Sequence, residues 1–462
     1  MTLYGDHISL KVDTRRLENN KSPDFLLYVM DISYFSGKLE MYFRYRNFNF
    51  LRIEPTLSEL HEIKKKTGTS QVPLVYDRLE NVWLRDTTYI IRYMEEKYIP
   101  KPCQSPIYPD CAIQQFVSLV LEDFADEYMW RPAMYMRWEP GVDSKVVSTR
   151  FVWEFVDRSG FVKLLPKSLA SSIMIFRQWL FSVFGEGIVE PLQHTIVQSQ
   201  FYAVMDSLQT IFEHTPFMLG SHPTIADFGL LGPFFRHFSS DPTPRKIMQQ
   251  QAPEVYEWVG RMWNCKTDKL QPYYELVDST EMIPATWKPL FPLIKEYLKY
   301  LHQNALAWRR NEPSFKFLFQ GGHSIACYSL VQTVQYRVWC RLEMQKRFLE
   351  LQAKDKEKTE QLTKILKELD WWDPLWKDGL IECVAEFGSE PPFCKPYPNA
   401  KTPDTPKWSL EFLLMRFFKE KMQTILLIGF IIAGLIFLGF ITTITSSKYR
   451  NIYKALNYNV LI

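Results

Sequence analysis

The sequence predicts an α/β domain in the amino-terminal part of the chain, then a long helical region, then a single transmembrane helix near the carboxyl end. An apolar strand-like run at 25–30 passes directly into a segment with helical spacing, and residues 110–214 show long helical periodicities with few glycines. Residues 422–447 contain no charged side chain. A chain of 462 residues has room for two to three domains of about 150 residues each.

Composition narrows the class of protein. The formal net charge of +3 is too small to indicate a polyanionic partner, so we expect no nucleic-acid binding. The seven cysteines are odd in number and include no CxxC pair, which favours reduced thiols in the cytosol over a disulfide framework. The eight histidines are scattered, and none lies four residues from another, so we predict no metal site.

A first motif joins a strand to a helix. The run at 25–30 indicates a buried strand, and Leu39, Phe43 and Arg46 lie at helical spacing beyond it. Ser33 falls at the junction, where serine is also a common helix N-cap. The pattern therefore places a hydroxyl at a strand-to-helix turn.

Two further motifs follow at short intervals. Pro73, after Val72, lies between short β-type runs, where proline in mid-strand is disfavoured and a turn, with a cis bond as one option, is favoured. Asp86 and Thr87 precede a segment with one apolar face, which is an N-cap signature for a helix.

In order and spacing, these three motifs resemble the amino-terminal domain of glutathione transferases. The resemblance implies an α/β thioredoxin-like domain followed by an all-α domain, which is the glutathione transferase fold. It continues to 217–228, where Thr224 and Asp227 look like the capping box of the second domain. The match covers about 24–276, and four motifs in sequence are more specific than any one of them.

The resemblance also implies a ligand and its contacts. Glutathione would be the co-substrate, and Ser33 would be the catalytic hydroxyl beside its sulfur. Gln71, Val72 and Pro73 would hold the cysteinyl part through main-chain groups, while Asp86 and Thr87 would bind the γ-glutamyl end. The sequence leaves open which hydroxyl lies nearest the sulfur, that of Ser33, Ser36, Tyr34 or Tyr28. An alternative role for Ser33 is that of a helix N-cap without a catalytic function.

The uncharged run at 422–447 would reach about 39 Å as a helix, against a hydrocarbon core of about 30 Å, so we expect it to span a membrane. Residues 1–16 are broken by charges and show no signal peptide. We therefore expect a tail-anchored protein with its amino-terminal part in the cytosol. Basic residues after the span favour the mitochondrial outer membrane over the endoplasmic reticulum.

The predicted organisation ends with a helical extension. Helices are expected at 287–300 and 328–369, with a packed or membrane-interface aromatic segment at 370–376. Residues 322–326 imitate the nucleophile elbow of serine hydrolases, but no histidine follows Ser324, so Ser324 is read as a helix cap. The predicted boundaries are 1–24 (N-terminal extension), 25–103 (thioredoxin-like domain), 104–280 (helical domain), 281–385 (extension), 386–421 (Pro-rich linker), 422–447 (span) and 448–462 (basic tail).

Two functions from different classes follow. The first is a membrane-anchored glutathione transferase-like enzyme that activates glutathione as a thiolate for attack on a small electrophile, with a homodimer as one option. The second is a non-catalytic scaffold of the same fold at an organelle membrane, as in metaxins and ganglioside-induced differentiation proteins. The sequence does not specify the electrophile.

Overall fold

The computed structural model describes residues 22–100, 105–156, 166–270, 283–321 and 325–381. The chain divides into two compact units, 1–406 and 407–462. All described residues belong to the first unit. The predicted linker and transmembrane run, 386–447, and the tail lie outside the described residues. Among those that are described, no helix has both the length and the apolar character needed to cross a membrane.

The first domain is a four-stranded sheet with helices on both faces. The strand order is β2-β1-β3-β4, with β1 parallel to β2 and the other pairs antiparallel. The apolar alternation of β1 turns Phe25 and Leu27 toward the core beneath α2 and α4. The elements are β1 Phe25–Tyr28, α2 Tyr34–Tyr45, β2 Phe50–Ile53, α3 Leu57–Thr67, β3 Leu74–Asp77, β4 Val82–Arg85 and α4 Thr87–Lys97.

The second region is helical, as predicted, and several of its α-helices pass directly into π-helical turns. Its elements are α5 Ala112–Asp123, η2 Phe124–Tyr128, α6 Trp130–Trp138, α7 Val142–Phe151, η3 Val152–Val156, α8 Lys167–Gln178, η5 Trp179–Phe184, α9 Pro191–Phe212, α10 Ile225–Pro233, η6 Phe234–Phe238, α11 Pro242–Gln251, α12 Pro253–Asn264 and the 3₁₀ turn η7 Thr267–Lys269. The predicted capping box at the start of α10 is confirmed, because the backbone N–H of Thr224 donates to Asp227 at 2.9 Å.

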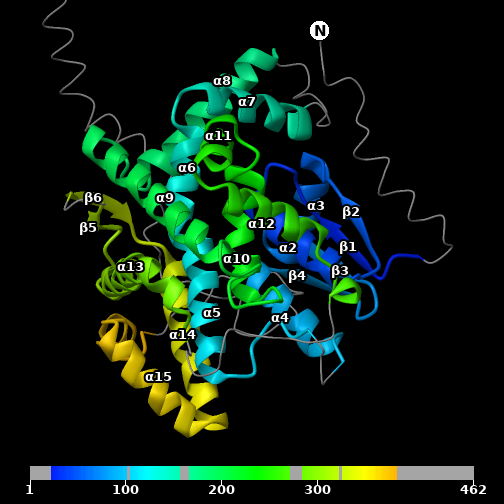
Figure 1. The fold of residues 1–462 in the computed structure, drawn as a ribbon. Helices are drawn as coiled ribbons and strands as arrows, with labels where there is room; N and C mark the ends of the chain where they lie inside the picture. Colours follow the sequence, from blue (N-terminus) through cyan, green and yellow to red (C-terminus); the bar gives the residue numbers. More distant parts are fainter. Residues whose placement is uncertain (1–21, 101–104, 157–165, 271–282, 322–324, 382–462) are drawn as a thin grey trace, which may run out of the picture. The chain divides into compact units, whose positions relative to one another are not determined.

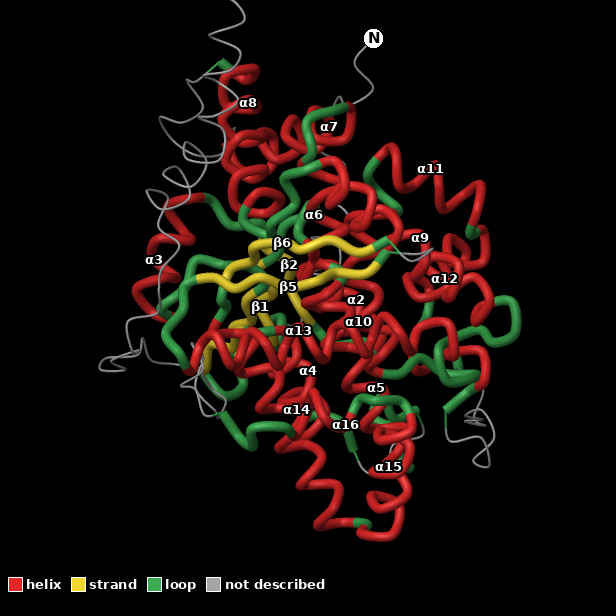
Figure 2. Tube along the Cα trace, turned by 90° about the vertical axis from the view of Figure 1, so that its left-hand side faces the viewer, coloured by secondary structure: helices red, strands yellow, loops and turns green. Residues whose placement is uncertain are grey.

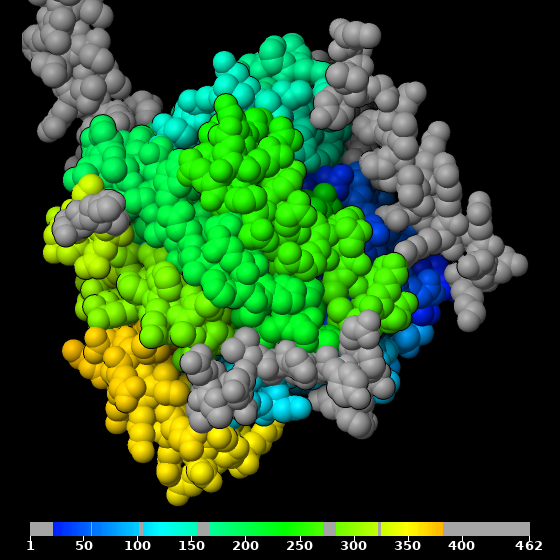
Figure 3. Space-filling model, in the orientation of Figure 1, coloured from blue at the N-terminus to red at the C-terminus, as the bar shows by residue number. Residues whose placement is uncertain are grey.

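The extension packs against the helical region. It comprises η8 Ala285–Leu290, α13 Phe291–Arg309, β5 Ser314–Gln320, β6 Ala326–Gln332, α14 Gln335–Lys354, α15 Lys356–Glu368 and α16 Trp372–Trp376. Helix α14 lies along α5 (Figure 1), and the yellow and orange extension is continuous with the helical region in the space-filling view (Figure 3). Trp371 is fully buried, so the aromatic segment is a packed corner.

One predicted helix is wrong over its first residues. Residues 326–332 form strand β6, antiparallel to β5, and the helix begins only at Gln335. Ser324 itself lies outside the described residues. The described residues that follow it form β6 from Ala326, and no helix begins before Gln335, so the prediction that Ser324 caps a helix is wrong. The hairpin and the four-stranded sheet stand on opposite sides of the helices in Figure 1 and overlap only in the turned view of Figure 2.

Candidate functional site

The predicted site segments meet at one end of the four-stranded sheet. Tyr28, the last residue of β1, pairs with Leu74, and Leu74 pairs with Arg85, the last residue of β4. The loop that follows β1, the proline that precedes β3 and the residue that follows β4 are therefore neighbours. Ser33, Pro73 and Asp86 come from these three segments.

Ser33 is the N-cap of α2, at the predicted strand-to-helix turn. Its Oγ accepts the backbone N–H of Ser36 at 3.3 Å, and the residue remains partly exposed. A hydroxyl that accepts one hydrogen bond still has its own proton to donate. Ser33 therefore places an O–H donor at the amino end of α2, where the helix dipole also favours an anion.

The other candidate hydroxyls have different positions. Ser36 is completely buried and accepts the N–H of Met30 at 3.2 Å. Tyr34 is 2 % exposed, and its hydroxyl donates to the carbonyl of Ala125 at 2.5 Å. Tyr28 alternates to the sheet face opposite the buried Leu27 and packs against Trp83. Of the four hydroxyls, Ser33 is the one that is both partly exposed and at the start of α2.

The loop before Ser33 is held by the helical region. The backbone N–H of Ile32 donates to Glu154 at 3.3 Å, and its carbonyl accepts from Arg137 at 2.7 Å. Arg137 is itself fixed by a buried ion pair with Asp241. Burial, together with the nearby Asp31, raises the pKa of Glu154 to about 7. The two domains therefore both determine where Ser33 lies.

The Val72-Pro73 bond is cis, in agreement with the predicted turn. Pro73 is buried, Val72 is partly exposed and Gln71 is exposed, and sheet pairing begins at Leu74. The backbone N–H of Gln71 donates to Thr69 Oγ1 at 3.0 Å. The turn thus presents Gln71 and Val72 at the surface beside Asp86.

Asp86 is the predicted N-cap of α4, with an unpredicted backbone. Its φ is +72°, a conformation that costs a non-glycine residue about 1–3 kcal/mol and is concentrated at functional sites. Its Oδ1 accepts the N–H groups of Thr88 and Tyr89 at 3.1 and 3.2 Å. Thr87 is the first residue of the helix and is 6 % exposed.

A residue that the sequence did not indicate contacts Asp86. The Tyr336 hydroxyl, on α14, donates to Asp86 Oδ2 at 2.7 Å. Burial raises the pKa of the Asp86 carboxyl, and this hydrogen bond and the N–H groups of α4 oppose that rise. No local pattern marks Tyr336, because the two residues are 250 positions apart in the chain.

A buried charge cluster lies behind the site. The Lys38 ammonium, fully buried on α2, contacts Glu122 at 2.7 Å and Asp126 at 2.5 Å, and the Thr88 hydroxyl donates to Glu122 at 2.9 Å. These contacts join α2, α4, α5 and η2. Glu127, which follows Asp126 within η2, forms an ion pair with Arg337 on α14. The short segment η2 therefore connects both domains and the extension.

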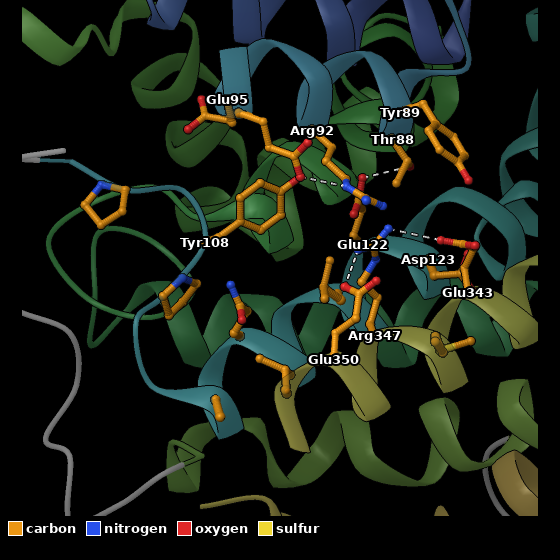
Figure 4. A pocket seen from close by; sticks show the side chains of 18 of the residues that line it. Thr88, Tyr89, Arg92, Glu95, Tyr108, Glu122, Asp123, Glu343, Arg347 and Glu350 are labelled. Atoms are coloured by element: carbon orange, nitrogen blue, oxygen red, sulfur yellow. Dashed lines mark hydrogen bonds and ion pairs between the residues drawn. The ribbon is translucent and has the colours of Figure 1, made fainter. Parts of the chain in front are cut away.

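A cavity of about 510 Å³ opens between α4, α5 and α14 (Figure 4). Its lining includes the aromatic rings of Tyr89, Tyr108 and Trp339 and several carboxylates, with Asp123 at its wall. Thr88 and Tyr89 belong to it, but Ser33 and Val72 do not. The cavity therefore adjoins the Asp86 end of the site and is not a chamber for chemistry at Ser33.

Comparison with known proteins agrees with this geometry in the first domain. Residues 27–102 match the family model described as the glutathione S-transferase N-terminal domain. This segment includes Ser33, Val72, Pro73, Asp86 and Thr87. No curated protein matches the chain significantly. The first domain is thus thioredoxin-like, of the glutathione transferase type.

Solved structures of glutathione transferases also align with the chain at low similarity. One from Rhodospirillum rubrum F11 is 13 % identical and covers 57 % of this chain and 97 % of its own, with a TM-score of 0.34. Glutathione transferase F7 from Populus trichocarpa is 13 % identical over 53 % and 96 %, with a TM-score of 0.34. Ure2p5 from Phanerochaete chrysosporium, with 1-(S-glutathionyl)-2,4-dinitrobenzene, is 14 % identical over 53 % and 90 %, with a TM-score of 0.30. The assignment rests on the domain match and the topology.

Within the part of the chain that the structure describes, no group of three or more His, Cys, Asp or Glu side chains is arranged to hold a metal ion. The cysteines described, which are Cys111, Cys265, Cys327 and Cys340, are free thiols.

Proposed function

We propose that this protein binds glutathione at the end of the sheet where Ser33, Val72-Pro73 and Asp86 meet, and that it activates the thiol for attack on a small electrophile. The observation that carries the proposal is the convergence of these three segments within the residues that match the transferase domain. Asp86 would pair with the γ-glutamyl ammonium, Thr87 with the adjoining carboxylate, and the turn at Gln71 and Val72 with the cysteinyl backbone.

Thiol activation requires a quantifiable stabilisation. A free thiol has a pKa of about 8.5, and lowering it by about 2 units requires roughly 2.7 kcal/mol of preference for the thiolate. A hydroxyl donor to a charged sulfur contributes about 1.5–3 kcal/mol, and the amino end of α2 adds about 0.3–1 kcal/mol. Ser33 with its helix is therefore sufficient in magnitude.

The binding half of the proposal is tested at Asp86. Asp86→Ala removes the charged acceptor and should weaken glutathione binding by about 1.5–3 kcal/mol, measured by titration calorimetry. Asp24→Ala is a matched control, because Asp24 immediately precedes β1 at the opposite end of the sheet. Equal affinities for the wild type and Asp86→Ala would remove Asp86 from the site. Melting curves separate the loss of the N-cap from the loss of the ligand contact.

A test of catalysis distinguishes a glutathione transferase from a non-catalytic scaffold of the same fold. The apolar run at 422–447 favours the second candidate, a non-catalytic scaffold of this fold at an organelle membrane. Conjugation of glutathione to 1-chloro-2,4-dinitrobenzene, followed by absorbance, distinguishes them. A rate above the uncatalysed reaction supports the transferase, whereas glutathione binding without any rate enhancement across a panel of electrophiles supports the scaffold.

We also propose that 422–447 crosses a membrane, with the large preceding part of the chain in the cytosol, and that the membrane is the mitochondrial outer membrane. Lys448, Arg450 and Lys454 follow the run with no acidic residue among them, and glycines and threonines moderate its hydrophobicity. A reporter fused to 408–462 should reach mitochondria, and neutralising the three basic residues should redirect it to the endoplasmic reticulum. A soluble reporter would refute the span, and an unmodified reporter at the endoplasmic reticulum would refute only the address.

A further inference from the structure

The cavity between α4, α5 and α14 has no part in the proposed function, yet it has the size of a ligand site. Its volume of about 510 Å³ lies within the range of about 300–1,000 Å³ that small-molecule sites occupy. Its aromatic lining comes from Tyr89 on α4, Tyr108 in the segment before α5 and Trp339 on α14 (Figure 4). The rings of Tyr89 and Trp339 pack together with centroids 5.2 Å apart. The cavity therefore suits a molecule with an apolar body.

The charge of the lining selects the sign of the ligand. Eight carboxylates and three cationic side chains line the cavity. Two of the eight are neutralised from behind the lining, because Glu95 pairs with Arg46 at 2.6 Å and Glu122 pairs with Lys38 at 2.7 Å. The six other carboxylates still outnumber the three cations. The electrostatic field inside the cavity therefore favours a positively charged ligand and disfavours an anion.

Asp123 is a carboxylate at the cavity wall that has no cation of its own. No lysine, arginine or histidine in the described part of the chain forms an ion pair with it, and the nearby Lys38 already contacts two other carboxylates. Its hydrogen bonds come from neutral donors, which are the Tyr297 hydroxyl at 2.5 Å and the Cys340 thiol. Asp123 lines the cavity and remains partly exposed. A cation in the cavity would supply the missing partner of this carboxylate.

A second polar group of the lining also lacks a partner. The Tyr108 hydroxyl forms no hydrogen bond with any residue that the structure describes. Burial and the nearby Glu122 raise the pKa of the Tyr108 phenol well above its ordinary value, so the group stays protonated and can both donate and accept hydrogen bonds. Figure 4 shows Tyr108 and Asp123 on opposite sides of Glu122. A ligand that lies between them would meet an anion at one end and an aromatic ring at the other.

We propose that this cavity binds a small organic ammonium ion, whose charged group pairs with Asp123 and whose apolar body lies among Tyr89, Tyr108 and Trp339. Aromatic faces attract organic cations, whereas hard metal ions such as Ca²⁺ and Mg²⁺ take oxygen ligands, so the lining favours an organic cation over a metal ion. The inference does not depend on the proposed function, because Ser33 and Val72 do not line the cavity.

The test compares two probes and three proteins by titration calorimetry, with the full chain in micelles of an uncharged detergent. The probes are tryptamine, a primary ammonium at neutral pH, and tryptophol, in which a hydroxyl replaces the amino group. The proteins are the wild type, Asp123→Asn and Asp110→Asn. Asp110 is a matched control, because it lines the same cavity but is exposed. Melting curves show whether each variant is folded.

The expected result is saturable binding of tryptamine to the wild type with one site per chain. Asp123→Asn should weaken this binding by about ten- to a hundredfold, in line with a hydrogen bond between two charged groups. Asp110→Asn should weaken it by at most about fivefold, as for an exposed charge pair. Tryptophol should bind the wild type more weakly than tryptamine does, and Asp123→Asn should not weaken its binding further.

Three results would overturn the inference. Absence of saturable tryptamine binding at millimolar concentration, with the wild type folded, would mean that the cavity is not a site for an organic ammonium ion. Equal losses in Asp123→Asn and Asp110→Asn would indicate general attraction to an acidic surface. Equal losses of tryptamine and tryptophol in Asp123→Asn would show that the variant changes the shape of the cavity and that Asp123 does not recognise the charge.

Discussion

At the scale of single residues, the candidate site combines ordinary caps with one unusual backbone. Ser33 and Asp86 both cap helices, but only Asp86 does so with a left-handed φ of +72°. An N-cap normally has extended φ and ψ, so capping alone does not account for the conformation. The strain at Asp86 is what an additional, ligand-directed task would explain.

Ser33→Ala should raise the apparent pKa of glutathione bound to the protein. The hydroxyl favours the thiolate by about 1.5–3 kcal/mol, so conjugation at neutral pH should fall by about ten- to a hundredfold while affinity changes far less. The ultraviolet absorbance of the bound thiolate as a function of pH measures the pKa directly. An unchanged pKa and rate in the variant would assign the sulfur to another donor.

Ser36→Ala is the control for that experiment. Its hydroxyl accepts the Met30 N–H inside the protein, so its loss leaves a buried donor unsatisfied. The melting temperature should therefore fall, while the pKa of bound glutathione stays the same.

Asp123→Asn should stabilise the protein at neutral pH and not in acid. Burial raises the pKa of Asp123 from 3.8 to about 6, so its ionisation costs more in the folded state than in the unfolded state. Stability from this group is present below about pH 4 and is lost as pH rises through about 6, a difference of about 2–3 kcal/mol. Denaturant unfolding at pH 4 and pH 7.5 measures it. A variant that is less stable than wild type at pH 7.5 would show that the ionised carboxylate is needed, through its bonds with Tyr297 and Cys340.

At the scale of elements, close helix contacts and buried ion pairs align the segments that carry the site. Helix α10 approaches α5 at Gly229, where a Cβ would lie 2.6 Å from the Cα of Glu122. Glu122 is a partner of both Lys38 and Thr88, so this contact supports the cluster behind Asp86. Arg337 attaches α14 to the helical region and thereby places Tyr336.

Gly229→Ala should destabilise the protein by about 1–3 kcal/mol, because the added methyl group meets backbone that cannot rotate away. Gly260→Ala is the matched control: it lies within α12 with nothing within 4 Å of its Cβ position, and should stabilise by about 0.4–1 kcal/mol. Unfolding free energies measure both. If Gly229→Ala stabilised the protein as Gly260→Ala is expected to do, α10 and α5 would have to be farther apart at this contact.

Arg337→Ala should cost about 3–5 kcal/mol, because it leaves Glu186 and Glu127 buried without their cation. The same change at Arg347, also on α14, should cost at most about 1 kcal/mol, since its ion pairs with Glu343 and Glu350 are partly exposed. Thermal unfolding compares the two. A small effect at Arg337 would mean that the extension is not attached to the helical region through this residue.

At the scale of the whole molecule, the features that could be predicted from the sequence are those that depend on neighbouring residues in the chain. The cap at Ser33, the turn at Pro73 and the start of α4 at Asp86 each follow from the residue type and its immediate neighbours. Helices before the extension were predicted for the same reason, since their apolar periodicity is long and regular.

The rest depended on contacts between distant segments. Val331, Val334 and Val338 fall at helical spacing, yet Val331 lies in β6, because its burial alternates with that of its neighbours against β5. The partner of Asp86 is 250 residues away, and Lys38 is buried only because Glu122 and Asp126 approach it from another domain. Neither pairing could be predicted from a local sequence pattern, because the partners are far apart in the chain.

The measurement that tests the central claim most directly is a calorimetric titration of the full chain, in detergent micelles, with glutathione. The account predicts saturable binding with one site per chain, competed by S-alkylated glutathione, which keeps the γ-glutamyl and cysteinyl contacts. Absence of binding at millimolar glutathione, with the protein shown to be folded by its melting curve, would contradict a glutathione site at Ser33, Val72-Pro73 and Asp86.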